Sequence, residues 1–175
     1  ITSKEFEIMN FFSISSIVAF FLLALAQTLI FNHLSIFGFI NPIIYLLFFV
    51  YYRFESNQTL FIGLAFLLGF FVDLFSHSGG AHTIATLTVG FLRPIIIRYA
   101  FGVTMDSPQS YFSDSRTINK FSFLVLIVFF HHIIYFTLVY FSWDTIHLIL
   151  KNTLFTSIFS LILMGIALSF YSNKK

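Results

Sequence analysis

The stretch LFIGLAFLLGFFVDLFSHSGGAHTIATLTVGFLRPIIIR, residues 60–98, decides the fold of this chain. It holds two apolar runs of membrane-spanning length, joined by a short Ser-His-Ser-Gly-Gly turn. It also carries four polar or charged side chains where hydrocarbon is expected, namely Asp73, His77, His82 and Arg93. The pattern predicts two transmembrane helices joined by a tight turn, with Gly79 and Gly80 in the turn.

Charged residues are scarce, and long stretches of the chain contain none. They make up 9% of the 175 residues, and the mean hydropathy is +0.94, whereas soluble domains are about a quarter charged. The uncharged stretches are residues 8–52, 56–72, 74–92, 121–143 and 152–173. A spanning helix needs ~20 apolar residues, so the first stretch holds two helices and each of the others holds one. The sequence therefore predicts an all-α, polytopic membrane protein with six transmembrane helices. No alternation of apolar and polar residues indicates a barrel.

The expected helices cover about residues 11–31, 36–52, 58–75, 80–91 or beyond, 119–141 and 148–171. Residues 1–8 are predicted to be a non-membrane lead, left from an added or truncated segment, with Met9 as the native start. Residues 9–175 are predicted to form a single transmembrane domain with one polar loop at about 102–118.

Two prolines interrupt the expected helices. Asn41-Pro42 is typical of a helix N-cap followed by the first helical residue, and a helix from Pro42 to Tyr52 would be only ~16 Å long. Either the second helix kinks at Pro42, or residues 36–40 enter the membrane as non-helical chain, which is tolerated only inside protein or along a cavity. Pro94 removes a hydrogen bond to the carbonyl of Gly90, so the fourth helix is expected to bend or stop there.

Basic residues predict the orientation of the chain in the membrane. With six spans, one side holds Lys4, Arg53, Arg98, Arg116, Lys120, Lys174 and Lys175, and the other holds Lys151 alone. The positive-inside rule therefore places both termini in the cytoplasm. Asp73 and the Gly79-Gly80 turn are then expected near the outer face, and Arg93 in the inner half.

Asp73 is predicted to be structural. A helix that starts at Pro42 inside lipid exposes backbone N–H groups and a partial positive charge, and a buried carboxylate needs a partner. Asp73, Asn41 and Pro42 are therefore expected to form one polar cluster. Arg93 is expected to extend its side chain to the cytoplasmic phosphates.

Small residues predict how the third and fourth helices pack. Gly63, Gly69, Ala81 and Ala85 stand among bulky side chains, and small residues let helices approach closely in a membrane. His131 and His132 point about 100° apart on a helix, so one site cannot use both.

The composition excludes several kinds of site. No cysteine is present, so disulfides and thiolate metal sites are impossible. Asp73, His77 and His82 have suitable side chains for a metal, but their spacing fits no known pattern, and no metal or cofactor is expected. HExxH, GxSxG and P-loop motifs are absent, so we expect no enzyme. A net charge of +2 does not suggest nucleic acid as a partner.

The hairpin and the residues before it resemble the MreD family, small integral membrane proteins of the bacterial rod-shape system. The matching features are N-P-x-x-Y-L-L at residues 41–47, L-x-G-F-x-x-D-L-F-S at 67–76, G-x-H-T-x-A at 80–85 and F-L-R-P at 91–94. Length and expected topology also match, so the resemblance covers the chain from Met9 onward.

The resemblance implies a non-enzymatic scaffold of the peptidoglycan elongation machinery in the bacterial inner membrane. It implies binding to an MreC-like protein with one membrane span, alongside MreB filaments, RodA and its transpeptidase. The family is also distantly similar in fold to the vitamin-binding subunits of energy-coupling-factor transporters. A small-molecule-binding subunit of that kind is therefore the alternative, and it requires a polar, aromatic-lined pocket near the outer face.

Overall fold

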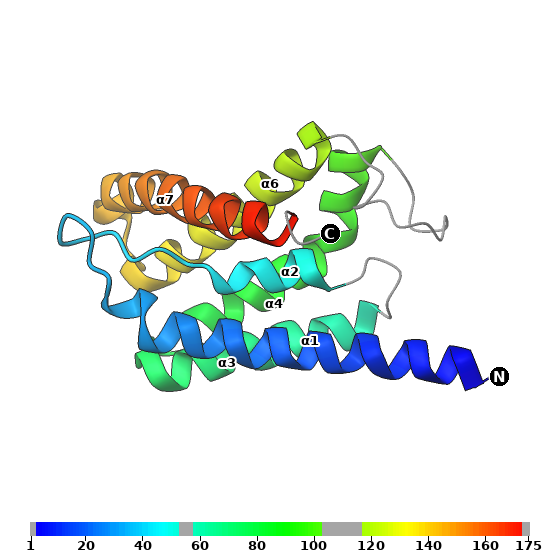
Figure 1. The fold of residues 1–175 in the computed structure, drawn as a ribbon. Helices are drawn as coiled ribbons and strands as arrows, with labels where there is room; N and C mark the ends of the chain where they lie inside the picture. The colour runs from blue at the N-terminus through cyan, green and yellow to red at the C-terminus, as the bar shows by residue number, and fades with distance from the viewer. Residues whose placement is uncertain (1–2, 53–57, 103–116, 173–175) are drawn as a thin grey trace.

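The computed structural model describes residues 3–52, 58–102 and 117–172, and within these ranges the chain is helical without a β-sheet (Figure 1). The long helices are α1 (Ser3–Leu29), α3 (Gln58–Ser76), α4 (Ala81–Phe101), α6 (Thr117–Tyr140) and α7 (Ile146–Ser172). The short ones are η1 (Phe31–His33), η2 (Tyr45–Leu47), α2 (Phe48–Tyr51) and η3 (Trp143–Thr145). In the described ranges, five helices are long and apolar enough to span a membrane. The all-helical fold with several helices of membrane-spanning type is confirmed, but the described residues contain no sixth helix of that length.

The expected second helix is replaced by chain that is mostly irregular. Residues 34–44 contain no helix, and the first helical turn begins at Tyr45, so the prediction that a helix begins at Pro42 is wrong. Ile36 pairs with Ile40 in an isolated antiparallel bridge. Ile40 and residues 42–50 are buried. Irregular chain at this depth is tolerated because it is enclosed by protein, as the second of the two sequence-based alternatives required.

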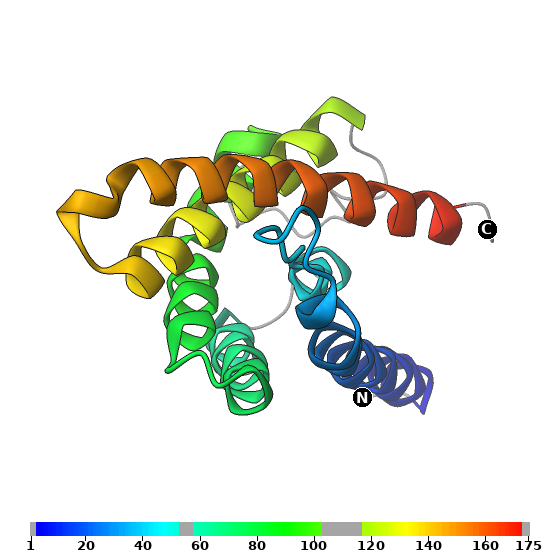
Figure 2. The same cartoon turned by 90° about the vertical axis from the view of Figure 1, so that its left-hand side faces the viewer.

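The chain runs back and forth between two ends of the molecule. The turns at residues 30–44, 77–80 and 141–145 lie at the left in Figure 1, the first residues of α1 lie at the right, and the last residues of α7 lie near the middle of the picture. Figure 2 looks onto the left-hand end, where α7 passes over the segment that precedes α2. We call this the turn end; it corresponds to the expected outer face. Most of the predicted loop at 102–118 lies outside the described residues. The predicted lead at 1–8 lies partly outside them, and its described part belongs to α1, which begins at Ser3.

Pro94 lies inside α4 and does not end it, since the helix continues to Phe101. The carbonyl of Gly90 loses its usual donor because proline has no N–H. Gln58, at the start of α3, supplies the missing bond through Nε2 at 2.8 Å from that carbonyl. A side chain from the neighbouring helix thus lets α4 pass through the proline.

The packing of α3 against α4 is closest at Gly69. A Cβ atom built on Gly69 would lie 2.2 Å from Oγ1 of Thr86 and 2.7 Å from the carbonyl oxygen of His82. A Cβ atom on Gly90 would lie 3.2 Å from Cβ of Ala65. The prediction of close packing is confirmed at Gly69. It is wrong at Gly63, where a Cβ atom would meet nothing within 4 Å.

The other predicted small residues lie on the buried side of α4. Ala81 and Ala85 are 6% and 0% exposed. The turn before them contains Gly79 and Gly80, with φ of +64° and +92°, a region that glycine adopts without strain. The Gly79-Gly80 turn was therefore predicted correctly.

Candidate functional site

Asp73 caps the beginning of α4. It lies near the end of α3, is 8% exposed, and accepts hydrogen bonds from the backbone N–H groups of His82 (3.1 Å) and Thr83 (2.7 Å). The hydroxyls of Ser78 and Thr83 also donate to its carboxylate. Gly80 occupies the N-cap position of α4 and has no side chain, so α3 supplies the acceptor that the helix start requires.

The predicted cluster of Asp73 with Asn41 and Pro42 is therefore wrong in its partners. Gln27 of α1 serves the segment after Pro42: its Oε1 accepts from the backbone N–H of Ile44 at 2.8 Å, and its Nε2 donates to the carbonyl of Pro42 at 3.1 Å. Oγ of Ser160, on α7, accepts from the N–H of Ile43 at 2.9 Å. Neutral side chains from two helices, and not a carboxylate, satisfy this irregular backbone.

Arg93 is wholly enclosed by protein, with 0% exposure. Its Nη2 donates to the carbonyl of Tyr52 at 2.7 Å, and its guanidinium carbon lies 4.0 Å from the centroid of the Phe61 ring. Tyr52 is the C-cap residue of α2, so a cation faces the end of a helix where carbonyls lack partners. The prediction that Arg93 reaches the lipid phosphates is wrong, because these contacts hold it inside the bundle.

Three aromatic side chains form a buried hydrogen-bonded cluster. The hydroxyl of Tyr45 lies 2.9 Å from Nδ1 of His82 and 2.7 Å from Nε2 of His131. The three residues belong to η2, α4 and α6 and are at most 3% exposed. The cluster therefore joins the short segment to both helices that pack beside it.

His132 takes part in a separate chain of hydrogen bonds, as the divergent directions of two adjacent helical residues predict. Its Nδ1 lies 2.7 Å from the carbonyl of Val128 and must carry the proton, because a carbonyl only accepts. Nε2 is then the acceptor for the hydroxyl of Ser160 at 3.3 Å. The oxygen of Ser160 in turn accepts from Ile43, so α6 and α7 together hold the irregular segment.

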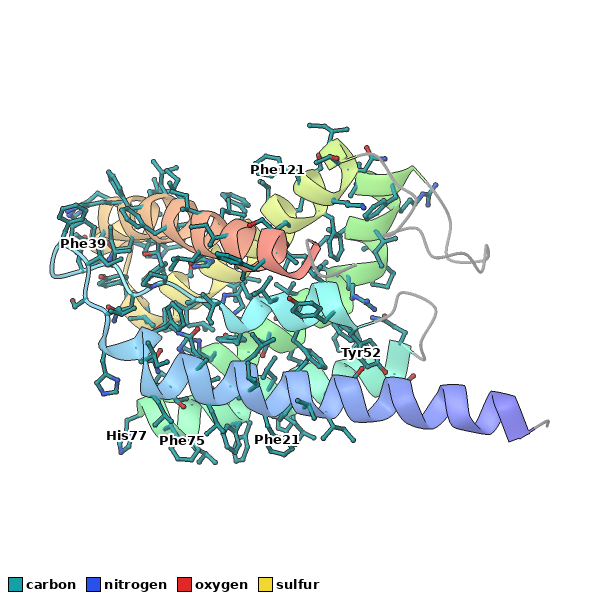
Figure 3. All side chains as sticks on the ribbon, viewed as in Figure 1. Phe21, Phe39, Tyr52, Phe75, His77 and Phe121 are labelled. Atoms are coloured by element: carbon teal, nitrogen blue, oxygen red, sulfur yellow. The ribbon has the colours of Figure 1, made fainter. Side chains whose placement is uncertain are left out.

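The described residues contain no group of three histidine or acidic side chains that could hold a metal ion. His77 lies in the turn and is exposed, with φ of +54°, and it projects away from the helices in Figure 3. His82 is buried instead, so the two histidines on either side of the turn face different surroundings.

A cavity of about 290 Å³ opens at the turn end, between α1, the irregular segment, the α3–α4 turn and α6. Its polar lining includes Asn32, Asn41, Ser76, His82 and Tyr135. Aromatic rings complete the wall. The cavity is thus lined by both polar and aromatic side chains.

One wall of the cavity is the turn that packs on α7. Phe39 lines the cavity, and its ring centroid lies 6.1 Å from that of Phe155 and 4.3 Å from Nζ of Lys151. Phe37 packs edge-on against Phe159 in the same way, at 6.2 Å. Figure 3 shows Phe39 beside α7. Contacts with α7 therefore fix the position of this wall.

Sequence reasoning missed Gln27, Ser160 and Tyr45. The available signal was a long amide side chain inside an otherwise apolar span, because polar residues within membrane helices normally face protein partners. Tyr45 was quoted only as part of a motif, and its two histidine partners lie 37 and 86 residues further along the chain.

The fold and the internal polar contacts define the class: a helical protein of multi-pass membrane type in which polar side chains such as Gln27, Asp73 and Arg93 form bonds inside the fold. No protein-family model, curated protein or solved structure matches the chain.

Proposed function

We propose that this chain is a non-enzymatic scaffold subunit of the bacterial peptidoglycan elongation machinery, located in the cytoplasmic membrane. It binds an MreC-like partner with one membrane span through the lipid-facing surfaces of its helices. The proposal rests on the resemblance to the MreD family and on one structural observation, the inward use of polar side chains. The side chains of Asp73, Arg93 and Gln27 form hydrogen bonds with backbone groups inside the chain.

The surface available to a partner is therefore apolar. Exposed large residues follow one side of α3, with Phe66, Phe70 and Leu74 at 41%, 46% and 57% exposure, and one side of α7, with Leu154 and Ile158 at 59% and 44%. Of the connections at the turn end, residues 77–80 and 141–145 are short, and the longer one, 30–44, is bonded to α1 and α7. A typical stable interface buries ~1,200–2,000 Å². Contact within the membrane is the arrangement that this surface favours.

The test is co-purification of tagged chain from native membranes, read by mass spectrometry. Two double variants are made: Phe66→Ala with Phe70→Ala on α3, and Leu154→Ala with Ile158→Ala on α7. At least one of the two is expected to lose the single-span partner. Replacing the exposed turn residue Trp143 (90% exposed) with alanine is the matched control and is expected to leave the partner bound. Loss of the partner through turn substitutions alone contradicts the proposal.

A second candidate function is the small-molecule-binding subunit of an energy-coupling-factor-like transporter. The specific observation in its favour is the polar cavity at the turn end. The two functions differ in what accompanies the purified chain: a single-span protein for the scaffold, and a vitamin-type molecule in stoichiometric amount for the transporter subunit.

A further inference from the structure

We propose that the cavity at the turn end binds a small uncharged molecule through oxygen atoms that accept hydrogen bonds. The inference goes beyond the scaffold proposal, and it deepens the second candidate function by naming the ligand chemistry. It rests on the charge of the lining, on the hydrogen-bond donors in it and on which ring nitrogen of His82 carries the proton.

The lining carries no aspartate, glutamate, lysine or arginine, and its titratable side chains are those of His33, His82 and Tyr135. Asp73 lies behind the wall, bonded to Ser78 and to the backbone of His82, both of which belong to lining residues. On another side, Nζ of Lys151 lies 4.3 Å from the ring of the lining residue Phe39, so opposite charges stand behind the wall and neither sign of ligand charge is favoured. The carboxylate oxygens of Asp73 already accept hydrogen bonds from four donors, so they are poorly placed to bind a cation in the cavity. The cavity is therefore suited to a neutral molecule.

Several lining groups keep a hydrogen that no described acceptor takes. The side-chain amide of Asn32 uses its oxygen for Gln27 and one N–H for Ser76, which leaves one N–H. The oxygen of Ser76 accepts that bond, and its own hydrogen has no acceptor among the described residues. The hydroxyl of Tyr135 likewise has no bonded partner in the described part of the chain. Three donors thus belong to residues that line one cavity.

His82 adds a fourth donor, and its tautomer follows from its neighbours. The hydroxyl of Tyr45 can donate to only one of the two histidines and must accept from the other. Nδ1 of His131 is buried without a partner, and an orphaned donor is rarer in proteins than an under-used acceptor. His131 therefore carries its proton on Nε2 and donates to Tyr45. Tyr45 then donates to Nδ1 of His82, which leaves the Nε2 proton of His82 for the cavity.

Size and shape select a molecule larger than water. The volume of about 290 Å³ lies near the lower end of the ~300–1,000 Å³ typical of small-ligand sites. The rings of Phe39, Phe75 and Phe136 form apolar parts of the wall, where water would lack partners. A compact molecule with a flat apolar body and one or two carbonyl or ester oxygens fits both kinds of surface.

The chain has no cysteine, which permits a labelling test on the purified full-length protein in mild detergent. Ser76→Cys places a single thiol in the lining and leaves the donors of Asn32, His82 and Tyr135 in place. Ser142→Cys, an exposed turn position outside the lining, is the matched control. The probes are benzamide, benzoate and benzylamine, which share one ring and differ in charge, and the readout is the rate of maleimide labelling.

At ten times its Kd, benzamide is expected to slow labelling at position 76 about tenfold, with no change at position 142 and little effect of the two charged probes. Adding Tyr135→Phe, which keeps the ring packed on His82, removes one donor and should raise the half-protecting concentration about two- to tenfold. Monoolein replaces benzamide in a parallel arm. Protection by monoolein alone supports the same chemistry and assigns the source to an uncharged lipid headgroup.

Equal protection by all three probes, equal protection at position 142, or no protection by benzamide or monoolein would overturn the proposal. No partner protein is present in the assay. Failure of the scaffold proposal is registered only in the co-purification experiment, so the two results remain distinguishable.

Discussion

Replacing Asp73 with leucine removes the cap of α4. The backbone N–H groups of His82 and Thr83 both point to the lost carboxylate. A buried donor left without a partner costs about 1–3 kcal/mol, so Asp73→Leu is expected to lower the free energy of unfolding by about 2–6 kcal/mol. Asp73→Asn keeps one acceptor oxygen, and about half of that loss is expected.

The measurement is reversible unfolding by a denaturing detergent in mixed micelles, followed by helicity. Asp144 lies exposed in η3 at the same end, and Asp144→Asn is expected to change the unfolding free energy by less than about 0.5 kcal/mol. If Asp73→Leu is as mild as this control, the capping role is wrong.

Double-mutant cycles separate the observed partner from the one expected from sequence. Asp73→Leu combined with Thr83→Val should show a coupling of about 1 kcal/mol or more, because the two side chains are bonded directly. Asp73→Leu combined with Gln27→Leu should be additive, since Gln27 serves a different backbone segment. Coupling in the second cycle and none in the first would favour the original sequence-based expectation.

Two further predictions use pairs of variants in the same helices. Gly69→Ala is expected to cost about 1–3 kcal/mol through overpacking, whereas Gly63→Ala, with open space around it, should be neutral or stabilise by up to about 1 kcal/mol; thermal unfolding in detergent compares the two, and equal effects would contradict the packing. Gln58→Ala should cost about 1 kcal/mol in the native chain and less in a Pro94→Ala background, where an N–H again serves the Gly90 carbonyl; equal costs in both backgrounds, by the same assay, would show that Gln58 does not compensate for the proline.

The positions of several helices could be predicted because a membrane-spanning helix needs a charge-free stretch of a certain length. α3 and α7 were expected at about 58–75 and 148–171 and begin and end within about two residues of those bounds. The second span was harder to predict, because the residues from Pro42 to Tyr52 are too few to cross as a helix and the sequence does not say what encloses them. The structure resolves this through side chains from α1 and α7.

Residues were predictable as anomalies, but their partners were not. Asp73 and Arg93 were singled out because a charge in hydrocarbon is costly. Their expected partners were wrong, because the sequence indicates how deep a residue lies in the membrane but not which helix it lies beside. Asp73 bonds to the helix that follows its own, and Arg93 bonds to a carbonyl 41 residues earlier. Gln27 carries no charge, so the signal from its amide inside an apolar span was weaker than that from Asp73 or Arg93. The cavity could not be predicted, because its lining comes from residues as distant as Thr28 and Phe136.

The hydrogen bond from Ile43 to Ser160 has a consequence for how the protein is made. The two residues lie 117 positions apart, so the backbone of the irregular segment stays incompletely bonded until the last helix has entered the bilayer. Such a segment is too short and too polar in its backbone to insert stably by itself, and contacts of this sequence separation form late. Chains that stall before α7 should therefore expose this segment to proteolysis, and the completed chain should protect it.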